Sequence, residues 1–423
     1  MSAATRSSTV RVGRRLAPLY ASAFTGGIAL WVPVEKLFLD ELGFTPAILG
    51  VMAALYAAAV PLLEVPSGIL ADRWSRRGVL VIGNLGALAS VAVGGLSTGV
   101  AMYLVAAVLL GVYFAMQSGT LDAIVYDAVL EETGSSDTFE AVLGRLRVVS
   151  SAALVIGALA GGALAALTSP RLTYFATLPL LVVSTVALLS FREPKLHEGG
   201  ESMGVRQHIA TAVNTVRGQP QLLPIVALLV VTSLLTQAVY EFGPLWLVAA
   251  DAGPGLYGPA WALLMASLGL GGAIATRLRI DRSGPRIIVV GLLAESGLTL
   301  VAVRDPIVAT LAQVVLATFA VAAGVVGTRL LHDRIASSVR ASVSSGVGAA
   351  TWLTFVPFAI AFGALADELG IQAGAWLLMA LTVASIGLLW SVSRPRFAEQ
   401  ASAQTNSAIS WAACAAPSVS TSR

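Results

Sequence analysis

The chain has 423 residues, of which 57% are hydrophobic and only 12% are charged, and its mean hydropathy is +0.83. A soluble domain uses roughly a quarter charged residues to cover its surface, so most of this surface must face lipid. A helix that spans a bilayer takes about 20 apolar residues. The length therefore suits about twelve such helices and excludes a large additional soluble domain.

Composition also excludes several classes of function. The single cysteine, Cys414, allows neither an internal disulfide nor a cysteine-based metal site. The two lysines, Lys36 and Lys195, do not follow a glycine, so the phosphate-binding loop of common ATPases is absent. The formal charge of +3 gives no basic surface for nucleic acid. We therefore expect no enzyme activity, no cofactor, no metal and no nucleic-acid partner.

The first fifteen residues carry four arginines and precede a long apolar run. That run exceeds the apolar part of a signal peptide and no small-residue cleavage site follows, so we expect it to remain as the first spanning helix. Continuous apolar runs favour helices over barrel strands, which alternate over about ten residues. The predicted spans are 16–40, 46–71, 78–99, 101–129, 143–168, 171–191, 221–250, 256–277, 286–304, 306–331, 341–369 and 371–392.

The longest polar stretch between spans divides them into two groups of six. We expect an all-α membrane protein whose twelve transmembrane helices form two pseudo-symmetric six-helix bundles. Its expected parts are a cytoplasmic N-terminal tail (1–15), an N-terminal bundle (16–191), a cytoplasmic linker (192–220), a C-terminal bundle (221–393) and a cytoplasmic tail (394–423) whose composition is typical of disorder.

The arginines predict the orientation. With a cytoplasmic N-terminus, only three of the 26 Lys and Arg residues fall at the outer side, namely Lys36, Arg171 and Arg304. This strong bias follows the positive-inside rule and supports an even number of spans with both termini in the cytoplasm. We expect a multi-pass protein of the cytoplasmic (inner) membrane.

The two halves repeat one another. Asp72-Arg73 recurs as Asp281-Arg282, Gly119-Thr120 recurs as Gly327-Thr328, and Glu35 recurs as Glu241, all at nearly one offset. Parallel repeats related by an axis along the membrane normal are a known transporter architecture. The repeat therefore favours a transporter.

The loop after the second span reads GILADRWSRRGVL. It resembles the G-x-L-a-D-R-x-G-R-R signature of the major facilitator superfamily, in the branch of drug and metabolite exporters, with Ser75 in place of one glycine. The resemblance implies that an Asp and an Arg of this loop form a network with an acid at the end of helix 4, which latches the two halves in the outward-open state. The residues that carry this latch here are Gly68, Asp72, Arg73, Arg76, Arg77 and Asp127.

A second resemblance lies in the fifth span, where GALAGG (Gly157 to Gly162) is similar to the G-P-x-x-G-G motif of proton-coupled antiporters, with Ala158 in place of proline. Close packing of small residues between helices would give the same pattern. The drug-exporter branch also usually has an arginine in the middle of helix 4, and this chain has none there.

Ionisable residues inside a spanning helix cost about 2.5–3.5 kcal/mol each at the bilayer centre, so each needs a reason. The acids in question are Glu35, Glu64, Asp122, Glu241 and Glu295. The resemblance implies that helices 1, 4, 7 and 10 line a central cavity. The candidate substrate and proton residues on those helices are Trp31, Glu35, Tyr113, Gln117, Asp122, Gln237, Tyr240, Glu241, Gln313 and Arg329.

Such a cavity, with a few carboxylates and an aromatic wall, suits an amphipathic and cationic small molecule. A carboxylate in low dielectric can also load and release a proton near neutral pH. We predict a monomeric secondary transporter that exports an amphipathic compound in exchange for protons. Uptake or uniport of a metabolite is the first alternative, and a non-transporting membrane sensor or scaffold is the second.

Reporter fusions test the predicted topology. Fusions near Gly43, Gly253 and Gly370 should report a periplasmic location, and fusions near Gly134 and Gly200 a cytoplasmic one, because the arginines hold the latter loops inside. A single loop with a clearly inverted reporter signal would refute the twelve-helix topology.

Overall fold

The computed structural model describes residues 3–117, 120–134, 138–194, 205–275, 283–335 and 337–392. These residues contain helices and connecting loops without a strand, and twelve of the helical segments are long and apolar enough to cross a membrane. The predicted all-α fold with twelve spans is confirmed. The predicted disordered tail (394–423) and the repeated Asp281-Arg282 pair lie outside the described residues.

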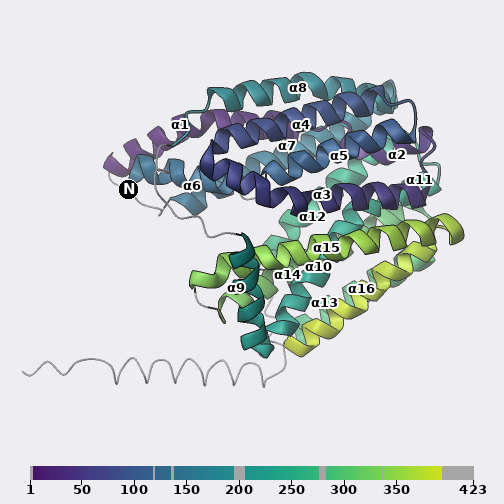
Figure 1. Ribbon diagram of the computed structural model, residues 1–423. Coiled ribbons are helices and arrows are strands. Elements are labelled where there is room, and N and C mark those ends of the chain that lie inside the picture. Colours follow the sequence, from purple (N-terminus) through teal and green to yellow (C-terminus); the bar gives the residue numbers. More distant parts are fainter. Residues whose placement is uncertain are drawn as a thin grey trace, which may run out of the picture.

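The N-terminal half forms the upper layer in Figure 1. Its helices are α1 (Ala3–Gly27), η1 (Val32–Val34), α2 (Glu35–Glu41), α3 (Pro46–Arg73), α4 (Arg76–Leu96), α5 (Val100–Gln117), α6 (Thr120–Thr133), α7 (Phe139–Leu167) and α8 (Pro170–Ser190). The C-terminal half contains η2 (Pro220–Leu222), α10 (Leu223–Phe242), α11 (Leu245–Ala249), η3 (Pro254–Leu256), α12 (Tyr257–Ala275), α13 (Ser283–Ala302), α14 (Pro306–His332), α15 (Ser337–Leu369) and α16 (Ile371–Val392).

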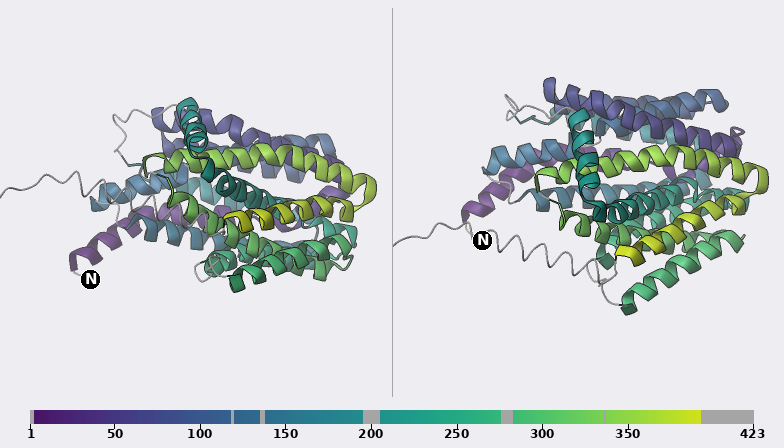
Figure 2. Two further views of the ribbon diagram at one scale, coloured as in Figure 1. Left: turned by 90° about the horizontal axis from the view of Figure 1, so that it is seen from below. Right: turned by 60° about the horizontal axis from the view of Figure 1, so that its bottom comes forward.

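A further helix, α9 (Val205–Gly218), occupies part of the stretch predicted as a linker. It packs against α15 and lies across the spanning helices at the end of the molecule that also carries the N-terminus (Figures 1 and 2). We call this the α9 end, and we call the opposite end, where α2 and α11 meet, the α2 end.

The first span is not the single continuous helix that the apolar run 16–40 predicts. Helix α1 stops at Gly27, and the chain passes through a short irregular segment before η1 and α2. The glycine pair at the end of α1 favours this break, and the broken segment packs closely against α7. A Cβ at Gly161 would lie 2.1 Å from the carbonyl oxygen of Leu30, and one at Gly157 would lie 3.0 Å from the nitrogen of Ala29. The glycines of the GALAGG motif therefore allow α7 to pack directly against the non-helical backbone that follows α1.

Glycines also join the two halves at the α2 end. A Cβ at Gly50 of α3 would lie 2.4 Å from the carbonyl oxygen of Ala359 of α15, and one at Gly363 would lie 2.5 Å from the carbonyl oxygen of Pro46. On the other side of the molecule, a Cβ at Gly162 of α7 would lie 2.6 Å from the Cα of Gly258 in α12. Backbones this close leave no passage between the halves at this end.

The packing role of Gly161 can be tested in one helix with a built-in control. Gly161→Ala should lower the free energy of unfolding by about 1–3 kcal/mol, because the new methyl group overlaps the backbone of Leu30. Gly144 lies in the same helix with open space around its Cα, so Gly144→Ala should be neutral or stabilising. Equal melting temperatures of the two variants in detergent would contradict this account.

Candidate functional site: a cavity between the two halves

A cavity of about 910 Å³ lies between the two halves. Its walls come from all the helices α1 to α8 of the N-terminal half and from α10, α12, α14 and α15 of the C-terminal half. A volume of this size accommodates a drug-sized molecule. The wall is mainly apolar, with polar groups at a few places.

The cavity extends toward the α9 end and is closed at the α2 end. Its lining continues to Leu80 and Leu188, close to the ends of α4 and α8, and to Thr328 in the last turns of α14. At the α2 end, the glycine contacts of α3 with α15 and of α7 with α12 hold the halves together.

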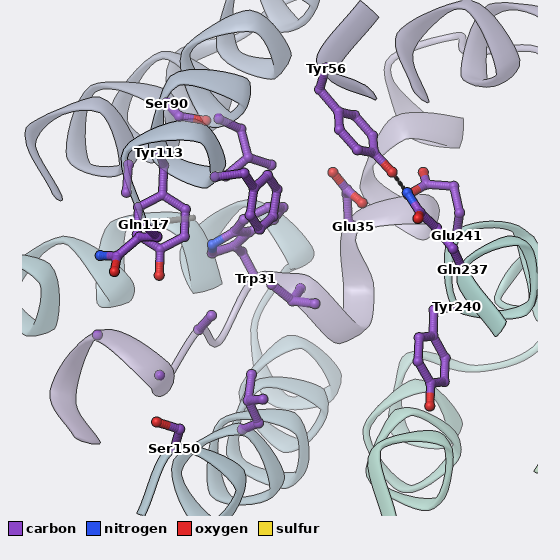
Figure 3. A pocket seen from close by; sticks show the side chains of 18 of the residues that line it. Trp31, Glu35, Tyr56, Ser90, Tyr113, Gln117, Ser150, Gln237, Tyr240 and Glu241 are labelled. Carbon is purple, nitrogen blue, oxygen red and sulfur yellow. Dashed lines mark hydrogen bonds between the residues drawn. The ribbon is translucent and has the colours of Figure 1, made fainter. Parts of the chain in front are cut away.

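A cluster of three charged side chains lies in the cavity wall near the α2 end (Figure 3 labels Glu35 and Glu241). The Lys36 ammonium donates to Oε2 of Glu35 at 2.9 Å and to Oε1 of Glu241 at 2.5 Å. Glu35 and Lys36 belong to the N-terminal half and Glu241 to the C-terminal half, so the lysine bridges the two. Only 4% of Lys36 is exposed.

Tyrosines complete the cluster. The hydroxyl of Tyr56 on α3 donates to Oε2 of Glu241 at 2.5 Å, and Figure 3 shows the ring pointing toward that carboxylate. The hydroxyl of Tyr103 on α5 donates to Oε1 of Glu35 at 2.9 Å and lies 2.7 Å from the hydroxyl of Tyr174. All four carboxylate oxygens thus receive a hydrogen bond, which buried charges require.

The cavity wall beside this cluster is aromatic. The Trp31 and Tyr174 rings lie 5.3 Å apart, and the Tyr56 and Trp352 rings, from opposite halves, lie 6.5 Å apart. Figure 3 shows Trp31 and Tyr113 on one side of the space and Tyr240 on the other. Rings of this kind offer faces to apolar bodies and to cations.

A second polar group lies deeper in the N-terminal half. Asn84 on α4 donates to the hydroxyl of Ser184 at 2.9 Å, and that hydroxyl lies 2.8 Å from the one of Ser22. Gln117 faces the same group and donates to Asn84 at 3.5 Å. These side chains give the apolar cavity a neutral hydrogen-bonding patch away from the charges.

The structure places seven of the ten predicted cavity residues in the lining. They are Trp31, Glu35, Tyr113, Gln117, Gln237, Tyr240 and Glu241. The other three lie elsewhere: Asp122 pairs with Arg147 at 2.9 Å on a largely exposed surface, Gln313 donates to the carbonyl of Gly243 behind the wall, and Arg329 is exposed. The acids Glu64 and Glu295 are also outside the lining.

Sequence reasoning missed Lys36, Tyr56, Tyr103 and Tyr174. Lys36 was interpreted as one of three basic residues at the outer side, although a lysine beside a glutamate within an apolar run is itself a signal for a buried ion pair. Tyr56 and Tyr174 gave no such signal, because they lie on the second and sixth spans, which were not expected to line the cavity. Tyr103 lies on the fourth span, which was expected to line the cavity, and was overlooked there.

The predicted latch residues lie at the α9 end. Arg76 forms an ion pair with Asp127, and Arg77 donates to the carbonyl of Phe191 at 3.0 Å. Ser75, which replaces the glycine of the signature, accepts from the nitrogen of Gly78 at 2.8 Å and donates to Glu193 at 2.5 Å. These contacts connect α4, α6 and the chain after α8, all within the N-terminal half.

The other predicted latch residues are Gly68, Asp72 and Arg73, and what the structure describes of them does not support a latch. The side chain of Asp72 lies outside the described side chains, and Arg73 is exposed. A Cβ at Gly68 would meet no atom within 4 Å, so this conformation does not use the close approach that the glycine allows. Among the described residues, no group of three His, Cys, Asp or Glu side chains is arranged to hold a metal ion.

The comparisons with known proteins agree with this architecture. The family model described as Major Facilitator Superfamily matches residues 16–328. Multidrug resistance protein 1 of Bacillus subtilis (strain 168) is 27% identical over 169 residues, which is 40% of this chain and 42% of that protein. The chain thus matches less than half the length of this relative.

Solved structures share the fold at low identity. The nucleoside transporter NupG has a TM-score of 0.70 and 13% identity, over 90% of this chain and 98% of that one. A D-xylose-proton symporter has a TM-score of 0.67 and 14% identity, over 90% and 97% of the two chains. A bacterial homologue of the lysosomal transporter Spinster, described as inward-facing and unoccupied, has a TM-score of 0.67 and 12% identity, over 91% and 95%.

Proposed function

This chain belongs to the major facilitator superfamily, and we propose that it is a secondary active transporter that exports an amphipathic small molecule in exchange for protons. The observation that carries the proposal is the cavity between two half-bundles, with carboxylates of both halves meeting in its wall. Transport by alternating access needs a site that both halves share, so that rocking one against the other changes the side from which the site is reached.

The α9 end faces the cytoplasm in this proposal. The arginines of the loops at that end follow the positive-inside rule, and both termini would lie there. The described conformation is then closed toward the periplasm and loads from the cytoplasm. The Arg76–Asp127 contacts would serve as the N-terminal part of the latch, which engages the other half when the α9 end closes.

Protons are the coupling ion that this site suits. Glu35, Lys36 and Glu241 together carry one more negative than positive charge when all are ionised, so the cluster can accept one further cation. A proton needs a single carboxylate, whereas sodium needs a shell of several oxygen ligands. A cationic substrate and a proton would compete for the same carboxylates, and this competition couples their movements in opposite directions.

Export is supported by similarity to the multidrug resistance protein and by the GALAGG segment. Uptake or uniport remains the second candidate, and the observation that favours it is the absence of an arginine from α5 (Val100–Gln117), where drug exporters usually have one. A static sensor or scaffold is disfavoured, because it would have no use for a latch. We propose that the functional unit is a monomer, because the cavity is complete within one chain.

Amide variants test proton coupling. Proteoliposomes with an imposed pH gradient, screened over lipophilic cations, antibiotics and sugars, would first identify a transported compound. Glu241→Gln or Glu35→Gln should then abolish accumulation against the gradient but leave downhill exchange partly intact, because the cavity and the rocking motion survive. Asp122→Asn should retain coupling, because its carboxylate pairs with Arg147 outside the lining.

Glu295→Gln is the matched control, since this glutamate is exposed on α13 and outside the lining. If the amide variants of Glu35, Asp122 and Glu241 all accumulate the compound with the pH dependence of the unmodified protein, proton coupling through these acids is wrong. Uniport, or coupling elsewhere in the molecule, would then be the better account.

A further inference from the structure

The bridge formed by Lys36 is asymmetric with respect to the two halves. Lys36 and Glu35 are neighbours on α2, so their contact at 2.9 Å lies within the N-terminal half and does not depend on how far apart the halves are. The contact with Glu241 at 2.5 Å exists only while α2 and α10 are close together. The second contact therefore depends on closure of the α2 end and contributes to it.

The ammonium of Lys36 also occupies a position that a ligand could use. It lies in the wall of the cavity and contacts Glu241, which also accepts from Tyr56, and the same wall carries the aromatic rings of Trp31 and Trp352. Its four-carbon stem is flexible, so the head group can leave Glu241 and keep its contact with Glu35. A soluble amine on an apolar body would find the same carboxylate and tyrosine hydroxyl, with aromatic faces beside them.

We propose that Lys36 is a tethered cation that fills the amine position of the substrate site, and that a protonated amine of the transported molecule displaces it from Glu241. The substrate class is then an aliphatic ammonium group joined to an aromatic or apolar body. Displacement breaks the ion pair between the halves and leaves the hydrogen bond from Tyr56 to Glu241, so binding of the ligand weakens closure of the α2 end. Loading from the α9 end thereby favours opening at the opposite end.

The charges of the cluster favour displacement of Lys36 from Glu241 over binding of a ligand ammonium beside a stationary Lys36. A ligand ammonium beside Lys36 would face a like charge within a few ångströms in a poorly screened wall, which is unfavourable. If Lys36 moves away and remains with Glu35, each carboxylate keeps one cationic partner. The ligand ammonium loses its water on entry, and its pairing with Glu241, which Lys36 has left, offsets part of that cost.

Equilibrium binding of a matched pair of fluorescent ligands tests this inference. Dansylcadaverine carries a primary amine on an aromatic body, and its N-acetyl derivative keeps the body without the charge. With purified protein in detergent at pH 8, Lys36→Met should bind dansylcadaverine about tenfold more tightly than the unmodified protein does, because the competing ammonium is gone. Its affinity for the acetylated compound should change less than twofold.

Three further variants control the measurement. Lys36→Gln should behave like Lys36→Met and guards against a folding defect in either. Lys36→Arg keeps a competing cation and should show no gain in affinity. Glu241→Gln should bind dansylcadaverine about tenfold more weakly and leave the neutral compound unaffected.

The inference is overturned if neither Lys36→Met nor Lys36→Gln gains affinity for the amine, if both ligands gain equally, or if dansylcadaverine binds to none of the proteins. The inference rests on the proposed function, but the binding experiment uses no gradient. A protein that shows the competition but no proton-driven transport would refute the coupling and keep the inference, and the reverse result would refute the inference alone.

Discussion

The ammonium of Lys36 lies between two carboxylates from opposite halves of the molecule, in a wall that is mostly apolar. Removing one member of a buried ion pair leaves an unpaired charge and costs about 3–5 kcal/mol, so the rest of the site must keep these groups satisfied. Tyr56 and Tyr103 do so by donating to the carboxylate oxygens that the lysine does not reach. The same groups that stabilise the closed α2 end are therefore the ones that a proton or a cation would disturb.

Helix geometry makes this cluster possible. The break after Gly27 turns the chain so that Glu35 and Lys36 lie on a separate short helix that faces α10, and Glu241 lies just before a second break, at Gly243 and Pro244. Glycines on α3, α7, α12 and α15 bring the backbones of the halves into contact around the cluster. Since the charged hydrogen bonds of the cluster need donor–acceptor distances near 3 Å, they depend on the close approach that the glycines allow.

The sequence predicted the twelve spans and their order because hydropathy and arginine placement report directly on lipid and on topology. It also predicted Glu35 and Glu241 as a repeated pair, and the structure shows both contacting one lysine. It did not predict the break in the first span, although Gly26, Gly27 and Pro33 inside the apolar run are local signals for one. The contact of this break with Gly157 and Gly161 of α7 exists only in the folded bundle. Nor did it predict the pairing of Asp122, whose partner Arg147 lies on α7 and comes within reach only in the folded bundle.

The Lys36–Glu241 contact stabilises the closed α2 end, and its loss should favour opening of that end. Glu41 and Asp251 are exposed on opposite halves at that end. Spin labels on cysteines introduced at these two positions, in a Cys414→Ser background, give a distance that reports the opening of that end directly. Double electron–electron resonance should give a short distance as the main population in the unmodified protein. Glu241→Gln should add a longer distance, because the bridge is lost. A single short distance that is the same in both proteins would contradict the account.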